Sequence, residues 1–213
     1  MSAWLVALLA PPTPGVWAGY QEVEGKREVP LLGVVKTLAR TWFLAELTPT
    51  PSGGFRLTQR PCHVEFKPVM GVRVGMAPEA VPKLPPSVGT FEPEGPGFAA
   101  QGWVTAWDAT DIDQDGHPGV TMRIEAPLCG GLLYVASQAT TRARARMQGD
   151  ALEGRVQVDV KQQVLGAEGA CLRQFAASEA EQVSGWFRLV PMPEGTQCPT
   201  DLATWPALPK QAP

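Results

Sequence analysis

The sequence lacks most of the residues on which common catalytic and metal sites depend. It contains no asparagine, and its two histidines, His63 and His117, lie in different sequence neighbourhoods. Two isolated histidines leave little material for Ser-His-Asp chemistry, and they complete no zinc spacing with the cysteines. There is also no G-x-S-x-G, no H-E-x-x-H and no phosphate-binding glycine loop. The sequence therefore argues against an enzyme, although paired carboxylates of the glycoside-hydrolase kind stay open.

Charge is also scarce. Only 18% of the residues are charged, and the formal net charge is -3. This balance excludes a general electrostatic attraction to nucleic acid or to anionic lipid. No segment beyond the N-terminus is apolar enough to cross a membrane. We therefore expect neither a nucleic-acid partner nor a membrane span.

Turn-forming residues are abundant. Glycine and proline each number 22, and they are dispersed along a chain of 213 residues. Many turns between short strands are typical of an all-β fold, and a single all-β domain of this length is common. The prediction is an antiparallel barrel or sandwich of about eight to ten strands. At most one short helix is expected, at residues 172–183.

The proline-rich stretch at residues 76–97 interrupts this pattern. Its six prolines remove backbone donors, so we expect no regular ladder there. A functional loop and a rigid covering strap are both open interpretations. Residues 19–213 are otherwise predicted to form one β-rich domain.

The N-terminal residues 1–18 resemble a secretory signal peptide. Residues 3–10 form an apolar run that is too short to span a bilayer, and Val16-Trp17-Ala18 fits a small-x-small cleavage site. The segment lacks the usual lysine or arginine before the apolar run. The expected location is the bacterial periplasm or the extracellular space.

Four widely spaced cysteines are consistent with two disulfides in an oxidising compartment, against the alternative of four buried thiols. The clearest hairpin joins residues 132–147 and 155–165, and matching its apolar faces requires paired residue numbers with an odd sum. A sum of 301 sets Ala145 opposite Val156 and centres the turn on Asp150-Ala151. This register brings Cys129 within one position of Cys171, and a bulge near Gly130-Gly131 would align them. The pairing Cys62–Cys198 then follows by exclusion.

The outgoing strand of that hairpin also carries a basic stripe. Arg142, Arg144 and Arg146 share one face, where they could meet phosphate or an acidic partner. The commoner use of such a row is a solvated strand face, and Asp159 across the ladder would partly neutralise it. The sequence favours the solvated face.

The segment from Asp108 to Gly119 carries the strongest motif. Asp111, Asp113 and Asp115 alternate with single residues and are followed by Gly116, an arrangement that curls three carboxylates around one point. Hard oxygen ligands in this pattern suit Ca²⁺. The motif resembles the DxDxDG calcium loops of EF-hands, dockerins and thrombospondin type 3 repeats.

That resemblance implies a further ligand from the carbonyl of His117. The position that supplies a bidentate carboxylate in EF-hands holds Met122, so Asp108 is the expected substitute, ahead of Thr121 and Glu125. An affinity of about 10⁻⁴–10⁻³ M follows. Because strands flank the segment, we expect a β-hairpin loop. The alternative is a metal-free acidic turn in which the aspartates cap backbone amides.

The seven tryptophans suggest either core packing or an aromatic-lined cavity. Trp42, Trp103 and Trp186 are the candidates for lining such a cavity. The entry Gly15-Val16-Trp17 resembles the Gly-x-Trp of the first lipocalin strand, which implies a carrier of a small apolar ligand.

The leading hypothesis is an exported binding or structural protein of the cell envelope or extracellular space, with a structural Ca²⁺ site. Its partner would be an apolar small molecule or another protein. A lipocalin-like carrier and a carbohydrate-active enzyme or module are the alternatives.

Overall fold

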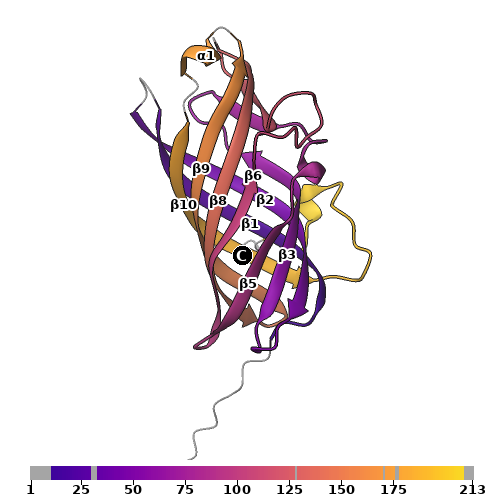
Figure 1. The fold of residues 1–213 in the computed structure, drawn as a ribbon. Coiled ribbons are helices and arrows are strands. Elements are labelled where there is room, and N and C mark those ends of the chain that lie inside the picture. Colours follow the sequence, from indigo (N-terminus) through magenta and orange to yellow (C-terminus); the bar gives the residue numbers. More distant parts are fainter. Residues whose placement is uncertain (1–10, 30–32, 128, 170, 176–177, 209–213) are drawn as a thin grey trace, which may run out of the picture.

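The computed structural model describes residues 11–29, 33–127, 129–169, 171–175 and 178–208. Strands account for most of them (Figure 1). The strands are β1 (Gly15–Val29), β2 (Gly33–Pro49), β3 (Phe55–Phe66), β4 (Arg73–Met76), β5 (Ser87–Glu94), β6 (Gly97–Trp107), β7 (Val120–Glu125), β8 (Gly131–Gln148), β9 (Ala151–Glu168) and β10 (Glu179–Pro191). The short helical elements are η1 (Val81–Lys83), α1 (Leu172–Phe175) and η2 (Leu202–Thr204). The predicted all-β class is confirmed.

One antiparallel sheet contains every strand and closes on itself. Its order is β4-β7-β8-β6-β5-β3-β2-β1-β10-β9, and β9 also pairs with β8. The strands from β8 round to β9 therefore form a barrel-like ring, while β7 and β4 extend the sheet beyond it. Closure removes the free strand edges that an open sheet would present.

Aromatic side chains fill one end of the ring. The inward-facing residues of the strands converge near the β2–β3, β5–β6 and β8–β9 turns. Phe55 stacks on Phe91 with ring centroids 4.7 Å apart, and Phe98 meets Phe55 edge-on at 5.2 Å. Trp17 and Leu189 are almost fully buried in the same cluster. A ring of about eight strands is just wide enough for side chains to fill its interior, as they do here.

The β8–β9 hairpin has a different register from the predicted one. Ala143 lies opposite Val156 and Ala145 opposite Gly154, so the paired numbers sum to 299 and not to 301. The alternation of faces along each strand requires only that the sum be odd, so the tight turn decides between 299 and 301. Gln148 pairs with Ala151, and Gly149 takes a positive φ of 62°, which suits a two-residue hairpin loop.

Both predicted disulfides are present. Cys129 joins Cys171, and Cys62 joins Cys198. The bulge that shifts the β8–β9 register lies between Tyr134 and Val135, not at Gly130-Gly131. Beyond it the paired numbers sum to 300, which is the sum that Cys129 and Cys171 require.

Two local predictions are wrong. The helix at residues 172–183 is confined to α1, because β10 begins at Glu179 and pairs with β9 and β1. Packing against two strands outweighs the weak helical preference of this segment. The proline-rich stretch is also not wholly irregular, since β5 lies within it and pairs with β3 and β6.

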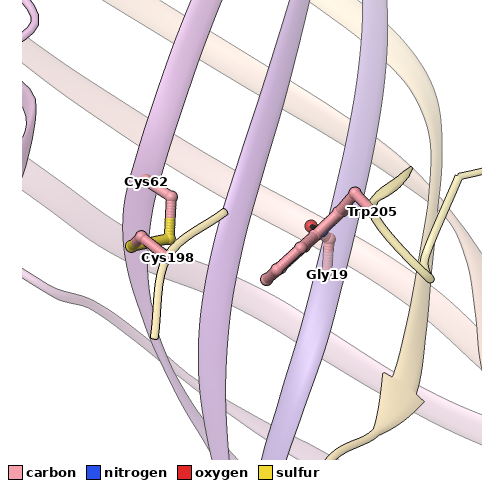
Figure 2. The surroundings of a disulfide bond; sticks show 4 residues. All are labelled: Gly19, Cys62, Cys198 and Trp205. Atoms are coloured by element: carbon pink, nitrogen blue, oxygen red, sulfur yellow. Dashed lines mark hydrogen bonds between the residues drawn. A yellow bond between two sulfur atoms is a disulfide. The ribbon is translucent and has the colours of Figure 1, made fainter. Parts of the chain in front are cut away.

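The C-terminal segment lies against the outer surface of β1 and β2 (Figure 2). The Cys62–Cys198 disulfide fixes it to β3, and the Trp205 indole donates a hydrogen bond of 2.8 Å to the Gly19 carbonyl. Trp205 packs there with Tyr20 and Trp42. The segment therefore covers an outward-facing aromatic patch that would otherwise be exposed.

The expected cleavage after Ala18 does not fit this fold. Trp17 and Ala18 belong to β1 and are buried, and Trp17 is part of the barrel core. Removing them would delete that packing. Residues 1–10 of the expected signal peptide lie outside the described residues.

Truncating the aromatic core should destabilise the protein strongly. Phe55→Ala removes a fully buried ring and should lower the free energy of unfolding by about 3–5 kcal/mol. Val34→Ala changes a side chain that is 69% exposed and should alter it by less than about 0.5 kcal/mol. Denaturant unfolding of both variants measures the difference, and equal losses would contradict the placement of the core.

Candidate metal site

The aspartate loop, residues 108–119, connects two strands that pair with the same edge of β8. Trp107 of β6 pairs with Ser137 of β8, and Val120 of β7 pairs with Val135 of the same strand. β6 and β7 therefore follow one another along a single edge of β8, and they do not pair with each other. The expected β-hairpin is corrected: the loop leaves this edge and returns to it two positions further along.

Two backbone hydrogen bonds close the base of the aspartate loop. The Gly119 amide donates to the Thr110 carbonyl at 2.9 Å, and the Ile112 amide donates to the Gly119 carbonyl at 3.1 Å. Glycine is required at 119, where φ is 77° and a Cβ would come within 2.5 Å of the Val135 carbonyl oxygen. The chain between Ile112 and Gly119 must therefore curl tightly.

The curl brings the three alternating aspartates together. Carboxylate oxygens of Asp111, Asp113 and Asp115 lie within 4.8 Å of one another. Part of their hydrogen-bonding capacity orders the loop itself. Asp111 accepts the amides of Asp115 and Gly116 at 3.0 and 2.9 Å, and Asp115 accepts the His117 amide at 2.9 Å. Such bonds are those of the metal-free acidic turn, and they leave further lone pairs on each carboxylate.

Asp113 differs from its two neighbours in burial. Its side chain is only 4% exposed, and its Oδ2 accepts the Thr121 amide at 2.9 Å. Its Oδ1 is buried and has no hydrogen-bond partner among the described residues. A buried carboxylate oxygen without a partner is costly, because its negative charge is neither solvated nor paired. A cation between the three carboxylates would satisfy it.

One positive charge already approaches the cluster. The Lys83 ammonium, in η1, donates a hydrogen bond to the backbone carbonyl of Asp113. Lys83 is the only cationic residue of the proline-rich stretch. Ala80, Val81 and Leu84 around it are buried, and Leu84 packs with Val120 and Met122 of β7. The stretch is thus a packed strap against the loop, and one ammonium does not balance three carboxylates.

The other predicted ligands have different neighbours. Asp108 accepts the Thr110 hydroxyl at 2.6 Å and the Thr110 amide at 2.8 Å, bonds that hold the pKa of its carboxyl below the usual range. The Asp108 carboxylate does not belong to the cluster. The His117 carbonyl as a ligand stays a prediction. The His117 ring stacks on Tyr134, with centroids 4.3 Å apart.

The three tryptophans expected to line a cavity are not brought together. Trp103 points into the barrel, where its indole donates to Ser87 at 2.9 Å. Trp42 and Trp186 lie on the outer surface with Tyr20. Successive side chains of a strand point to opposite faces of the sheet. Phe43 of β2 faces the core, so its neighbour Trp42 faces outward.

Comparisons with protein-family models, curated proteins and solved structures found no match. Within the described ranges, no helix is long and apolar enough to cross a membrane.

Both tyrosines of the chain should ionise at a higher pH than a solvent-exposed tyrosine. Burial and Glu22 raise the pKa of Tyr20 to about 12, and burial and a hydrogen bond to Glu168 raise that of Tyr134 to about 12. The neutral rings then stabilise the fold fully below pH 10, and this contribution is lost as the pH rises through about 12. Ultraviolet titration of the folded protein should show no tyrosinate step near pH 10, whereas the unfolded chain should.

Replacement of either tyrosine by phenylalanine should remove half of the tyrosinate absorbance that develops near pH 12. A folded wild-type protein in which half of the tyrosinate signal develops near pH 10 would contradict the burial of one ring.

Proposed function

We propose that this protein is an exported β-rich binding or structural protein whose aspartate loop is held to the barrel end by Ca²⁺. The single observation that carries the metal proposal is the buried Oδ1 of Asp113, which lies in a cluster with Asp111 and Asp115 and has no hydrogen-bond partner within the described ranges. Export is supported by the two disulfides, which persist in oxidising compartments.

Calcium fits this donor set better than the other common divalent ions. The converging ligands are all hard oxygens, which Ca²⁺ accepts in irregular geometry at about 2.3–2.6 Å. Zinc prefers nitrogen and sulfur, and both cysteine pairs are consumed by disulfides. Mg²⁺ demands a near-ideal octahedron. Without the bidentate carboxylate of an EF-hand, the expected dissociation constant is about 10⁻⁴–10⁻³ M.

The carrier alternative receives less support. The barrel end described above is filled by its own aromatic rings, and the tryptophans expected around an apolar ligand lie on opposite faces of the sheet. At the other end, Glu181 accepts a hydrogen bond from the Thr37 hydroxyl and approaches Gly25. A carboxylate at that end disfavours an apolar ligand.

Calcium should raise the melting temperature. At about 10 mM free Ca²⁺, a dissociation constant of about 10⁻⁴–10⁻³ M corresponds to roughly 1.4–2.7 kcal/mol of stabilisation. For a chain of this length the shift is about 3–10 °C relative to EDTA. Asp113→Asn keeps an acceptor for the Thr121 amide but removes the charge, so it should abolish the shift.

Asp108→Asn is the matched control, because the same chemical change lies in the same loop but outside the cluster. It should retain the calcium-dependent shift. A wild-type melting temperature that is identical in EDTA and in Ca²⁺ would overturn the metal proposal. If Asp113→Asn retains the calcium-dependent shift in melting temperature, the ion binds somewhere other than the aspartate cluster.

Lys83→Met should strengthen calcium binding. The substitution removes an ammonium that lies against the aspartate loop and repels an incoming cation. The dissociation constant for Ca²⁺, measured by calorimetry, should fall about two- to fivefold, the range expected of a partly screened charge. Weaker binding in Lys83→Met would instead show that Lys83 organises the loop for the metal.

A further inference from the structure

A row of side chains on the outer surface of the barrel combines two arginines with a tryptophan. Arg144 of β8 lies opposite Arg155 of β9, and Arg155 lies opposite Trp186 of β10. β9 pairs with β8 on one side and with β10 on the other, so the three side chains leave the sheet side by side. Directly opposite Cβ atoms in such a ladder are about 4.5–5.5 Å apart.

Two hollows of the surface meet at this row. They have volumes of about 750 and 550 Å³, and Arg144, Arg155 and Trp186 line both of them. Each volume is within the range of ligand sites in proteins, which is about 300–1,000 Å³. The two hollows adjoin on the outer faces of β8, β9 and β10, with further lining from β1, β5 and β6, and we call them together the outer groove.

The charges along the row are not balanced within the protein. Like charges directly opposite in a ladder are destabilising, and Arg144 and Arg155 are such a pair. Arg144 pairs with Glu94 at 3.0 Å, although its side chain is 74% exposed. In the described part of the chain, Arg155 has no ion pair. Glu22, on the far side of Trp186, is engaged by Arg40 at 2.8 Å. Among the described residues, Arg155 thus stands beside an aromatic ring without an ion pair of its own.

The larger hollow adds groups that donate and accept hydrogen bonds. Gln101, Gln157 and Ser184 line it, and so does Glu24. A hydroxyl both donates and accepts, so amides and a carboxylate around it suit a ligand rich in hydroxyls. The planar guanidinium of Arg155 suits a carboxylate, which it can bind through two parallel hydrogen bonds. Trp186 offers an apolar surface against which the C–H face of a saturated ring can pack.

We propose that the outer groove binds an acidic oligosaccharide, with a sugar carboxylate on Arg155 and a sugar ring against Trp186. Because the two hollows adjoin at the row, the groove offers room for more than one linked unit. The site is separate from the aspartate loop, and the proposal does not depend on calcium.

The charges of the groove distinguish this occupant from other polyanions. Glu22, Glu24, Glu94 and Glu153 line the two hollows, and they would repel a chain that is charged at every position without hydroxyls to offer. The net charge of -3 also disfavours nucleic acid. An acidic sugar brings both a carboxylate for the arginine and hydroxyls for the glutamates.

Titration calorimetry and tryptophan fluorescence of the full chain test the proposal. The probes are hexamers of galacturonate, mannuronate and guluronate, together with neutral cello- and malto-hexaose and with hexaglutamate. EDTA is present throughout, because carboxylates bind Ca²⁺. At least one acidic sugar hexamer should bind with a dissociation constant below about 1 mM, more tightly than the neutral sugars and hexaglutamate.

Arg155→Gln should weaken that binding at least about tenfold, as expected for loss of a charge-assisted hydrogen bond. Arg123→Gln is the matched control, since it makes the same change on an exposed arginine of β7 that does not line the groove. It should change the dissociation constant by less than about twofold. Three outcomes would overturn the proposal: no acidic sugar binds, neutral sugars or hexaglutamate bind as tightly, or the two variants behave alike.

Discussion

The edge of β8 that faces β6 is the constraint on which the candidate site depends. β8 is long enough to pair with β6 along one part of this edge and with β7 along the next. The chain between them has to leave the sheet and return almost to the same place. Closing such a loop costs conformational entropy, which the hydrogen bonds at Gly119 and the packing of Val120 help to offset.

This closure also forces like charges together. The carboxylates of Asp111, Asp113 and Asp115 converge because the loop is short and its base is fixed, and Asp113 is carried into the protein as Thr121 joins β7. Hydrogen bonds to backbone amides satisfy some of the oxygens but leave Oδ1 of Asp113 without a partner in the described part of the chain. Where free calcium is about millimolar, the proposed site would be roughly half to nine-tenths occupied and would contribute to stability.

The other edge of β8 positions the residues of the proposed outer groove. Pairing with β9 closes the ring and sets the register in which Arg144, Arg155 and Trp186 stand side by side. Alternation along the same strands sends Ala143, Ala145 and Val156 into the core. One strand thus supports a filled interior, the outer groove and the aspartate loop.

The sequence was sufficient to predict features governed by local spacing and parity. The alternation of apolar and charged residues predicted the β8–β9 hairpin, and its odd-sum register led to the Cys129–Cys171 disulfide. The D-x-D-x-D spacing was enough to predict that three carboxylates converge. These properties depend on period-two alternation and on short loops, which the order of residues determines directly.

Features that depend on distant partners were not predictable in this way. Two registers place the apolar faces together equally well, and the two-residue turn at Gly149 determines which one forms. The bulge beside Tyr134 then aligns the two cysteines. The strand β10 replaced an expected helix because it lies between β1 and β9. Lys83 reaches the loop from the proline-rich stretch, and no prediction from the sequence included it.

A crystal structure of the protein, from crystals grown in millimolar CaCl₂, tests the proposed calcium site most directly. We expect an anomalous density peak between the three aspartates, about 2.3–2.6 Å from Oδ1 of Asp113 and from oxygens of Asp111 and Asp115. A loop of the same conformation without such a peak, with the Asp113 oxygen bonded to water or to Lys83, would contradict the calcium site.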